Sequence, residues 1–256
     1  MQPKISEQFG LHIPEAQKRI KDIVKQTPLQ YVNSLSQYFE SNIYLKREDM
    51  QVVRSYKLRG AYNMISSLDK ELTKNGVVCA SAGNHAQGFA YSCNSLEIKG
   101  VVFMPKITPK QKIKQTRMFG NGYIEIQLIG DTFDDCANAA KKYAQENNMT
   151  FIPPFDDTRI IEGQGTIAIE ILEQLAQTKA DYIFIPIGGG GLCAGIGAYI
   201  RDHSPETQFI GAEPAGAPSM DSPFTAGPQV RLDHIAHFLY GAAVKSAGDI
   251  YYLNCK

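Results

Sequence analysis

The sequence lacks an excess of charge of either sign and has no long apolar run. Its 26 lysine and arginine residues balance 26 aspartate and glutamate residues, so the formal net charge is zero. A chain without a basic surplus is a poor match for nucleic acid or an anionic membrane surface. No apolar stretch approaches the roughly 20 residues of a membrane span, and Met1 to Gly10 has no apolar signal-peptide core. We therefore expect a soluble, cytoplasmic protein with no nucleic-acid or membrane partner.

The chain also lacks paired cysteines. Its five cysteines form no CxxC motif and are spread over the sequence: Cys79, Cys93, Cys136, Cys193 and Cys255. An odd number at irregular spacing suits neither a disulfide framework nor a zinc site, so reduced thiols are expected. His234 and His237 have no obvious third ligand, and the sequence predicts no metal site.

What the chain does have is an alternation of short apolar runs with amphipathic stretches. Strands are predicted at 42–46, 77–80, 100–104, 123–128, 150–152, 182–187 and 208–212. Helices are predicted at 14–26, 62–68, 84–93, 109–119, 133–146, 160–176 and from a glycine run to 200. Repeated βαβ units build mostly parallel sheets flanked by helices, so the predicted fold class is α/β. The strand at 182–187 is apolar throughout and is expected to be buried.

One lysine stands out in the block Ser-Tyr-Lys-Leu-Arg-Gly-Ala, where a strand pattern gives way to a helix pattern. A lysine amine attacks a carbonyl only when neutral, and burial or nearby cations lower its pKa toward that state. Arg54 and Arg59 are close enough to Lys57 in the sequence to contribute, and Tyr56 offers an aromatic face to a flat ring. The simpler alternative is a helical lysine that extends to solvent.

A second stretch joins a predicted strand to a predicted helix. It consists of Ser81, Ala82, Gly83, Asn84 and His85. Small residues at a helix N-terminus leave backbone N–H groups available, and a carboxylate suits that position. The alternative is an ordinary Asn84 cap on a packed helix.

A third stretch follows the apolar strand at 182–187 and opens a helix. It consists of Gly188, Gly189, Gly190, Gly191 and Leu192. Successive glycine N–H groups form a nest for a phosphate. A dinucleotide fold with an acid at Glu213 is the alternative, although Cys193 stands where the last glycine of G-x-G-x-x-G would be.

Together with Lys46-Arg47-Glu48-Asp49, these stretches make the chain resemble the threonine dehydratases (threonine ammonia-lyases) of the fold-type-II, tryptophan-synthase-β-like family of pyridoxal-phosphate enzymes. The resemblance covers about Leu29 to Asp249. It implies a small lobe at 71–150 and a large lobe built from 1–70 and 151–256, each with a mostly parallel sheet flanked by helices. It also implies a C-terminally truncated large lobe without the contact to the cofactor's pyridine nitrogen, and no regulatory domain.

The resemblance further implies roles for the three stretches. Lys57 would form the Schiff base with pyridoxal 5'-phosphate and, once displaced, remove the substrate's α-proton. Tyr56 would lie at the cofactor, Asn84 would bond its phenolic oxygen, and the stretch from Gly188 to Leu192 would hold its phosphate. The stretch from Ser81 to His85 would hold the substrate carboxylate.

Ala82 bears on the reaction that the resemblance implies. Serine racemases of this family carry a serine there, and alanine cannot deliver a proton, so dehydration is favoured over racemisation. The implied reaction converts L-threonine, and L-serine, to 2-oxobutanoate (pyruvate) and ammonia, as in isoleucine biosynthesis, in a homo-oligomer. Two alternatives stay open: an impaired chain that serves as a binding or partner subunit, and a nicotinamide-dependent dehydrogenase built on residues 188–213.

Overall fold

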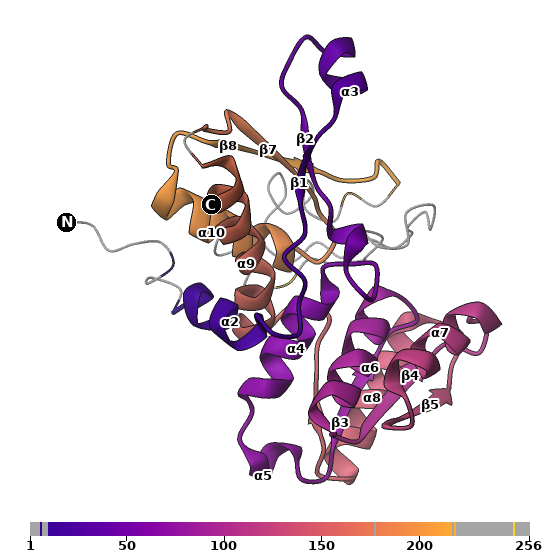
Figure 1. Cartoon of the computed structure of the whole chain (residues 1–256). Helices are drawn as coiled ribbons and strands as arrows, with labels where there is room; N and C mark the ends of the chain where they lie inside the picture. The colour runs from indigo at the N-terminus through magenta and orange to yellow at the C-terminus, as the bar shows by residue number, and fades with distance from the viewer. Residues whose placement is uncertain (1–5, 7–9, 177, 217, 219–247, 249–256) are drawn as a thin grey trace.

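A computed structural model of the chain describes residues 6, 10–176, 178–216, 218 and 248, and all structural statements below concern these residues. Figure 1 shows helices packed around separate sheets. The helices are α2 (Ile13–Ile20), α3 (Asn33–Tyr38), η1 (Glu48–Met50), α4 (Lys57–Ser67), α5 (Lys70–Thr73), α6 (Asn84–Leu96), α7 (Lys110–Gly120), α8 (Phe133–Glu146), α9 (Thr158–Leu175) and α10 (Gly191–His203). The strands are β1 (Leu29–Tyr31), β2 (Tyr44–Lys46), β3 (Val77–Ala80), β4 (Gly100–Met104), β5 (Ile124–Leu128), β6 (Thr150–Phe151), β7 (Tyr182–Pro186) and β8 (Gln208–Ala212).

The largest sheet of the described residues is parallel and has the strand order β5-β4-β3-β6. Every residue of β3 and β4 is buried, which suits a parallel sheet covered on both faces. Side chains alternate between the faces: Val77 and Cys79 pack with α6, whereas Val78 and Ala80 pack with α8. The carboxyl end of β3 therefore leads into the loop that begins α6.

A layer of helices lies beside this sheet, and close backbone contacts hold it together. Helix α9 packs against α4 on one side and against α10 on the other. A Cβ added at Gly163 would lie 2.6 Å from the Arg59 carbonyl oxygen, and one at Gly195 would lie 2.3 Å from the Ile161 carbonyl oxygen. Glycine is required at these crossings because a side chain would hold the helices apart. The layer joins the start of α4, at Lys57, to the start of α10, at Gly191.

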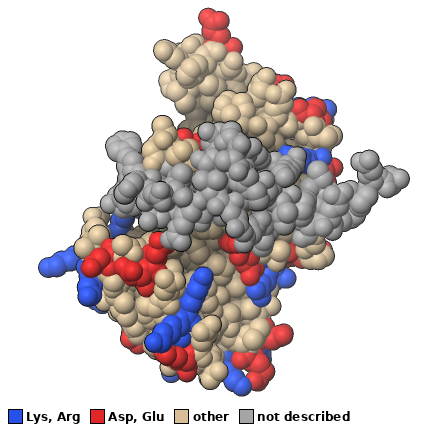
Figure 2. All heavy atoms as spheres, turned by 180° about the vertical axis from the view of Figure 1, so that it is seen from behind, with Lys and Arg blue, Asp and Glu red and all other residues tan. Residues whose placement is uncertain are grey.

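Two smaller sheets complete the described structure. Strands β7 and β8 are parallel and pair Tyr182 with Gln208, whereas β1 and β2 are antiparallel and pair Leu29 with Lys46. The β1–α3–β2 segment projects from the body at the top of Figure 1. No helix in the described ranges is long and apolar enough to cross a membrane. On the face shown in Figure 2, acidic and basic side chains are interspersed around the described surface.

The α/β fold with a parallel sheet flanked by helices is confirmed, and most predicted elements are found, but two details are wrong. The prediction that the strand at 182–187 is buried fails, because Tyr182 and Phe184 are 53% and 68% exposed. The exposed residues alternate along β7, so one face of this strand is accessible and the other is more buried. The predicted helix at 14–26 ends at Ile20. The lobe boundaries at 70 and 150 stay a prediction.

Candidate active site

Lys57 begins helix α4, and its side chain is partly buried. Burial lowers the pKa of the Lys57 amine to about 8. The ammonium donates a hydrogen bond to the Pro154 carbonyl oxygen at 2.9 Å. The Tyr56 ring lies 5.3 Å from the amine nitrogen, which is within the range of a cation–π contact. About a tenth of this amine is therefore neutral, and nucleophilic, at pH 7, far more than for an ordinary lysine.

The expectation that Arg54 and Arg59 lower the pKa of Lys57 is wrong. Arg54 is exposed, and burial alone accounts for the lowered pKa of Lys57. The Arg59 guanidinium is bound by Glu48 and Glu170, so its charge is compensated locally. The backbone at Arg54 has a φ of 58°, in the left-handed region, and this turn precedes the lysine helix.

The loop from β3 to α6 contains the predicted carboxylate-binding stretch. Gly83, rather than Asn84, is the N-cap of α6, and no side chain caps the helix. Asn84 is the first helical residue and its side chain is exposed. The Gly83 N–H donates to the Ser81 hydroxyl at 3.2 Å, so part of the predicted donor set is bonded within the loop. A Cβ at Gly83 would meet no atom within 4 Å, so the loop is open on that side.

His85 is buried in the first turn of α6 and stays neutral. Burial, assisted by the nearby Lys57 charge, lowers the pKa of His85 to about 3. Its Nε2 lies 3.1 Å from the Ile152 carbonyl oxygen, so Nε2 must carry the proton and donate it. The His85 ring is thus used in the hydrogen bond to Ile152. Of the polar groups of His85, only the main-chain N–H is left to bind an anion at the N-terminus of α6.

The glycine stretch forms the entrance to α10. Gly190 is the N-cap with a φ of 88°, which a side chain would strain. A Cβ at Gly189 would lie 2.3 Å from the Phe155 ring, and one at Gly191 would lie 2.8 Å from the Phe155 carbonyl oxygen. The first N–H groups of α10 have no acceptor within the helix, and the helix dipole favours an anion there.

One segment that the sequence did not mark as functional connects these three stretches. The segment Ile152–Phe155 accepts a hydrogen bond from His85 at Ile152 and one from Lys57 at Pro154, and it packs its Phe155 ring on Gly189. No residue-type signal could reveal the segment, because it acts through backbone carbonyls and one aromatic ring.

The residues present fit pyridoxal phosphate. A partly neutral lysine amine suits an aldehyde, and the glycine stretch can approach a phosphate only because it carries no side chains. The Pro154–Phe155 pair touches both the Lys57 amine and Gly189, so both groups lie next to the same dipeptide. Ser81 and Gly83 lie on the open loop before α6, where a substrate carboxylate would meet a helix N-terminus.

Other sequence expectations fall partly outside the described residues. His234 and His237 lie outside them, as does Cys255. Within the described ranges the remaining cysteines are all buried: Cys79, Cys93, Cys136 and Cys193. The reduced state expected for the cysteines stays a prediction.

Comparison with known proteins agrees with this geometry. Residues 20–252 match the family described as "Pyridoxal-phosphate dependent enzyme". A relative from Halalkalibacterium halodurans, named L-threonine dehydratase biosynthetic IlvA, is 53% identical over 94% of this chain and 58% of its own length. The protein of the same name from Bacillus subtilis is 52% identical over 93% of this chain and 56% of its own length. The chain thus spans little more than half of these relatives, as the resemblance implied.

Solved structures give the same result. The processed form of threonine deaminase isoform 2 from Solanum lycopersicum has a TM-score of 0.92 at 39% identity, covering 98% of this chain and 68% of that one. Maize serine racemase has a TM-score of 0.88 at 29% identity, covering 94% of this chain and 71% of that one. These matches leave the nicotinamide alternative without support. The chain therefore belongs to the pyridoxal-phosphate dependent enzyme family, with the fold-type-II architecture of the threonine deaminases.

Proposed function

We propose that this chain carries the pyridoxal-phosphate site of a threonine dehydratase, which converts L-threonine, and L-serine, to 2-oxobutanoate (pyruvate) and ammonia. One observation carries the proposal: the buried Lys57 amine and the glycine stretch contact the same dipeptide, Pro154–Phe155. The high identity to named threonine dehydratases supports the choice of reaction.

Each stretch has a role in this proposal. When bound, pyridoxal phosphate would supply the electron sink for negative charge that develops at the substrate's α-carbon. The backbone N–H groups at Gly191 and Leu192 would bind its phosphate, aided by the dipole of α10. Lys57 would hold the cofactor and then accept the α-proton at its amine nitrogen, for which a pKa of about 8 is suitable.

The loop before α6 would set the substrate's orientation and the outcome. The backbone from Ser81 to His85 would bind the carboxylate, and the Asn84 side chain, which is exposed at the start of α6, would bond a cofactor oxygen. Ala82 offers no proton donor on this side, which supports elimination over racemisation.

An absorbance spectrum tests the proposal. Purified chain mixed with pyridoxal phosphate should develop a visible band that Lys57→Ala abolishes, while Lys74→Ala, at an exposed lysine paired with Glu71, keeps it. Addition of L-threonine should change the band and release 2-oxobutanoate. A band that Lys57→Ala leaves unchanged would contradict the assignment of the lysine.

The same experiment separates the alternative of a binding or partner subunit. A Lys57-dependent band without 2-oxobutanoate release would favour that alternative, since the chain spans 58% of the first relative's length. Turnover would favour the enzyme, and size-exclusion chromatography of the loaded chain would test the expected homo-oligomer.

A further inference from the structure

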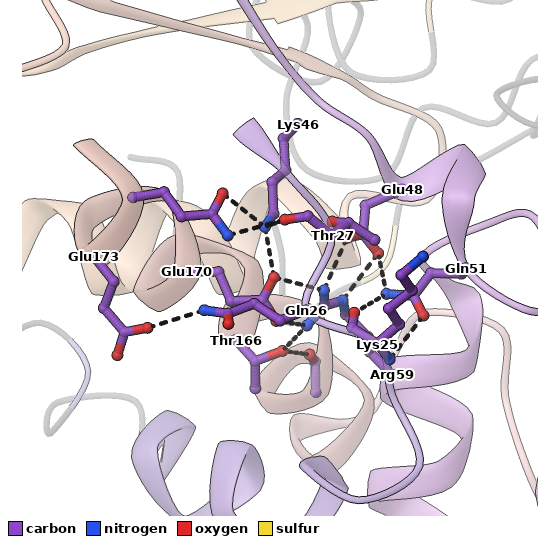
Figure 3. A network of polar contacts seen from close by, with 12 residues as sticks. Lys25, Gln26, Thr27, Lys46, Glu48, Gln51, Arg59, Thr166, Glu170 and Glu173 are labelled. Carbon is purple, nitrogen blue, oxygen red and sulfur yellow. Dashed lines mark hydrogen bonds and ion pairs between the residues drawn. The ribbon is translucent and has the colours of Figure 1, made fainter. Parts of the chain in front are cut away.

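Figure 3 shows a cluster of charged side chains around Arg59, which lies two residues after Lys57 in the sequence. Arg59 is fully buried, and its Nε and Nη2 donate to the two oxygens of Glu48 at 2.9 and 2.8 Å. Its Nη1 and Nη2 donate to the two oxygens of Glu170 at 2.7 and 3.0 Å, and Nη1 donates to Thr166 Oγ1 at 3.0 Å. All five guanidinium N–H groups therefore have acceptors.

The cluster joins three segments and is electrically balanced. Lys46, at the end of β2, donates to Glu170 at 2.5 Å and to the Thr27 carbonyl oxygen at 2.6 Å. Lys46 and Arg59 thus compensate Glu48 and Glu170. Buried ion pairs of this kind are poor sources of net stability, because desolvation offsets their attraction. Their reproducible effect is geometric: a bidentate arginine fixes both the distance and the angle between the groups that it joins.

The geometry that Arg59 fixes is the position of α4 along α9. The two helices run antiparallel, so residues later in α4 contact residues earlier in α9. Arg59 meets Glu170 and Thr166, and Gly60 packs against Gly163. One turn further along α4, the Asn63 side-chain amide donates to the Arg159 carbonyl oxygen at 2.6 Å.

Lys57 lies two residues before Arg59, about 3 Å along the axis of α4. The Pro154 carbonyl that receives its amine lies just before α9, and the glycine stretch opens α10 on the other side of α9. A slide of α4 along α9 would therefore carry the Lys57 amine away from Pro154 and from Gly189.

We propose that Arg59 is a positioning residue: through its two bidentate carboxylate pairs it fixes α4 along α9 so that the Lys57 amine faces the Pro154–Phe155 segment and the glycine stretch. The part of this inference that concerns the cofactor rests on the proposed function. The part that concerns the amine's location does not, and the two can be measured separately.

The amine's location is measured without any cofactor. Each lysine is acetylated competitively over a range of pH, and the extent of reaction is read by mass spectrometry. Lys57 of the unchanged chain should titrate near pH 8. Arg59→Lys keeps the charge but cannot bind two carboxylates bidentately, so its Lys57 should titrate roughly one pH unit or more higher as the amine leaves its dry position. His85 and Tyr56, which titrate at about pH 3 and 12, do not change charge over this range.

Two controls separate positioning from lost stability. Arg47→Lys makes the same change in a half-exposed bidentate pair with Asp49, one residue from Glu48, and should leave the Lys57 titration unchanged. Ile167→Ala lowers stability by opening a cavity in α9 at a residue that is 3% exposed and makes none of the hydrogen bonds given above for the cluster. Its Lys57 should also titrate near pH 8.

The cofactor gives the second measurement. The rate at which Lys57 captures pyridoxal phosphate, read as the growth of the visible band, should fall roughly 10- to 100-fold in Arg59→Lys and not in the two controls. Should Arg59→Lys fold poorly, Thr166→Val removes a single acceptor of Arg59 and should shift both readouts in the same direction by less.

The outcomes are distinct. An unchanged Lys57 titration in Arg59→Lys, or an equal shift in Ile167→Ala, would overturn the positioning role. Absence of the visible band in the unchanged chain would overturn the proposed function, while the acetylation titration would still decide the role of Arg59.

Discussion

The Lys57 amine is chemically useful because the fold keeps it away from water, and that placement destabilises the cofactor-free chain. The pKa of the amine is 10.5 in its unperturbed state and about 8 in the folded chain. Below pH 8 the amine is charged in both folded and unfolded chains, and the folded chain carries the full desolvation penalty. Between pH 8 and 10.5 only the unfolded chain binds the proton, so the penalty shrinks as the pH rises.

Replacing Lys57 should therefore stabilise the chain. A shift of this size corresponds to about 3 kcal/mol, and loss of the hydrogen bond to Pro154 removes about 1 kcal/mol of that gain. Lys57→Met should raise the melting temperature of the cofactor-free chain at pH 7, and by less at pH 9.5. The exposed Lys74→Met serves as the control in thermal unfolding. A lower melting temperature for Lys57→Met at pH 7 would show that the buried charge is not destabilising.

The same pKa predicts the pH dependence of cofactor capture. Only the neutral amine attacks an aldehyde, so the rate should fall about tenfold for each pH unit below 8 and level off above it. Stopped-flow absorbance at several pH values measures this rate. A rate that keeps rising to pH 10 would indicate an ordinary solvated lysine.

At the scale of elements, the entrance of α10 and the segment before α9 form one unit. The Phe155 ring occupies the space that a side chain at Gly189 would need, and its carbonyl lies against Gly191. The conformation of the glycine stretch therefore depends on its packing against Phe155 as well as on the backbone freedom of glycine.

Gly189→Ala should displace Phe155 and weaken binding of the phosphate. We expect roughly tenfold weaker binding of pyridoxal phosphate, about 1.4 kcal/mol, with a smaller effect on pyridoxal, which lacks the phosphate. Gly197→Ala is the matched control, because a Cβ there meets no atom within 4 Å and alanine favours a helix. Equal losses for pyridoxal and pyridoxal phosphate would argue against a phosphate site at this stretch.

Several elements could be predicted from the sequence and others could not, for identifiable reasons. The strands at 77–80, 100–104 and 208–212 and the helix at 133–146 have the predicted bounds, because their apolar periods are uninterrupted. Strand β1 and helix α3 were missed, since Leu29–Tyr31 and Asn33–Tyr38 are short and bury little.

For the site, the sequence was informative through its residue types, but it could not show which side chains point toward one another. Lys57 and the glycine stretch were predicted from their chemistry, whereas the pairing of Arg59 with Glu170 spans 111 residues of sequence and no local pattern shows it. The roles of Ile152 and Pro154 depend on main-chain carbonyls, which every residue carries.

At the scale of the whole molecule, the helices α4, α9 and α10 determine how far the lysine lies from the glycine stretch proposed to bind the phosphate. Their separation depends on glycines at both crossings, Gly163 toward α4 and Gly195 toward α10. Tightly packed helices transmit such changes because the interior has no spare volume.

Alanine at either crossing should separate the helices. Gly163→Ala and Gly195→Ala should each lower the free energy of unfolding by about 1–3 kcal/mol, because backbone atoms rather than flexible side chains block the added methyl group. Chemical denaturation measures the loss, with Gly197→Ala as the control on the same helix as Gly195. Wild-type stability in both variants would show that the crossings tolerate a wider spacing.

The most direct test of the whole account is to find where the cofactor is attached. The chain is mixed with pyridoxal phosphate, reduced with borohydride and digested, and the modified peptide is identified by mass spectrometry. The account predicts one modification per chain, on Lys57. Modification spread over the exposed lysines, with Lys57 unmodified, would contradict it.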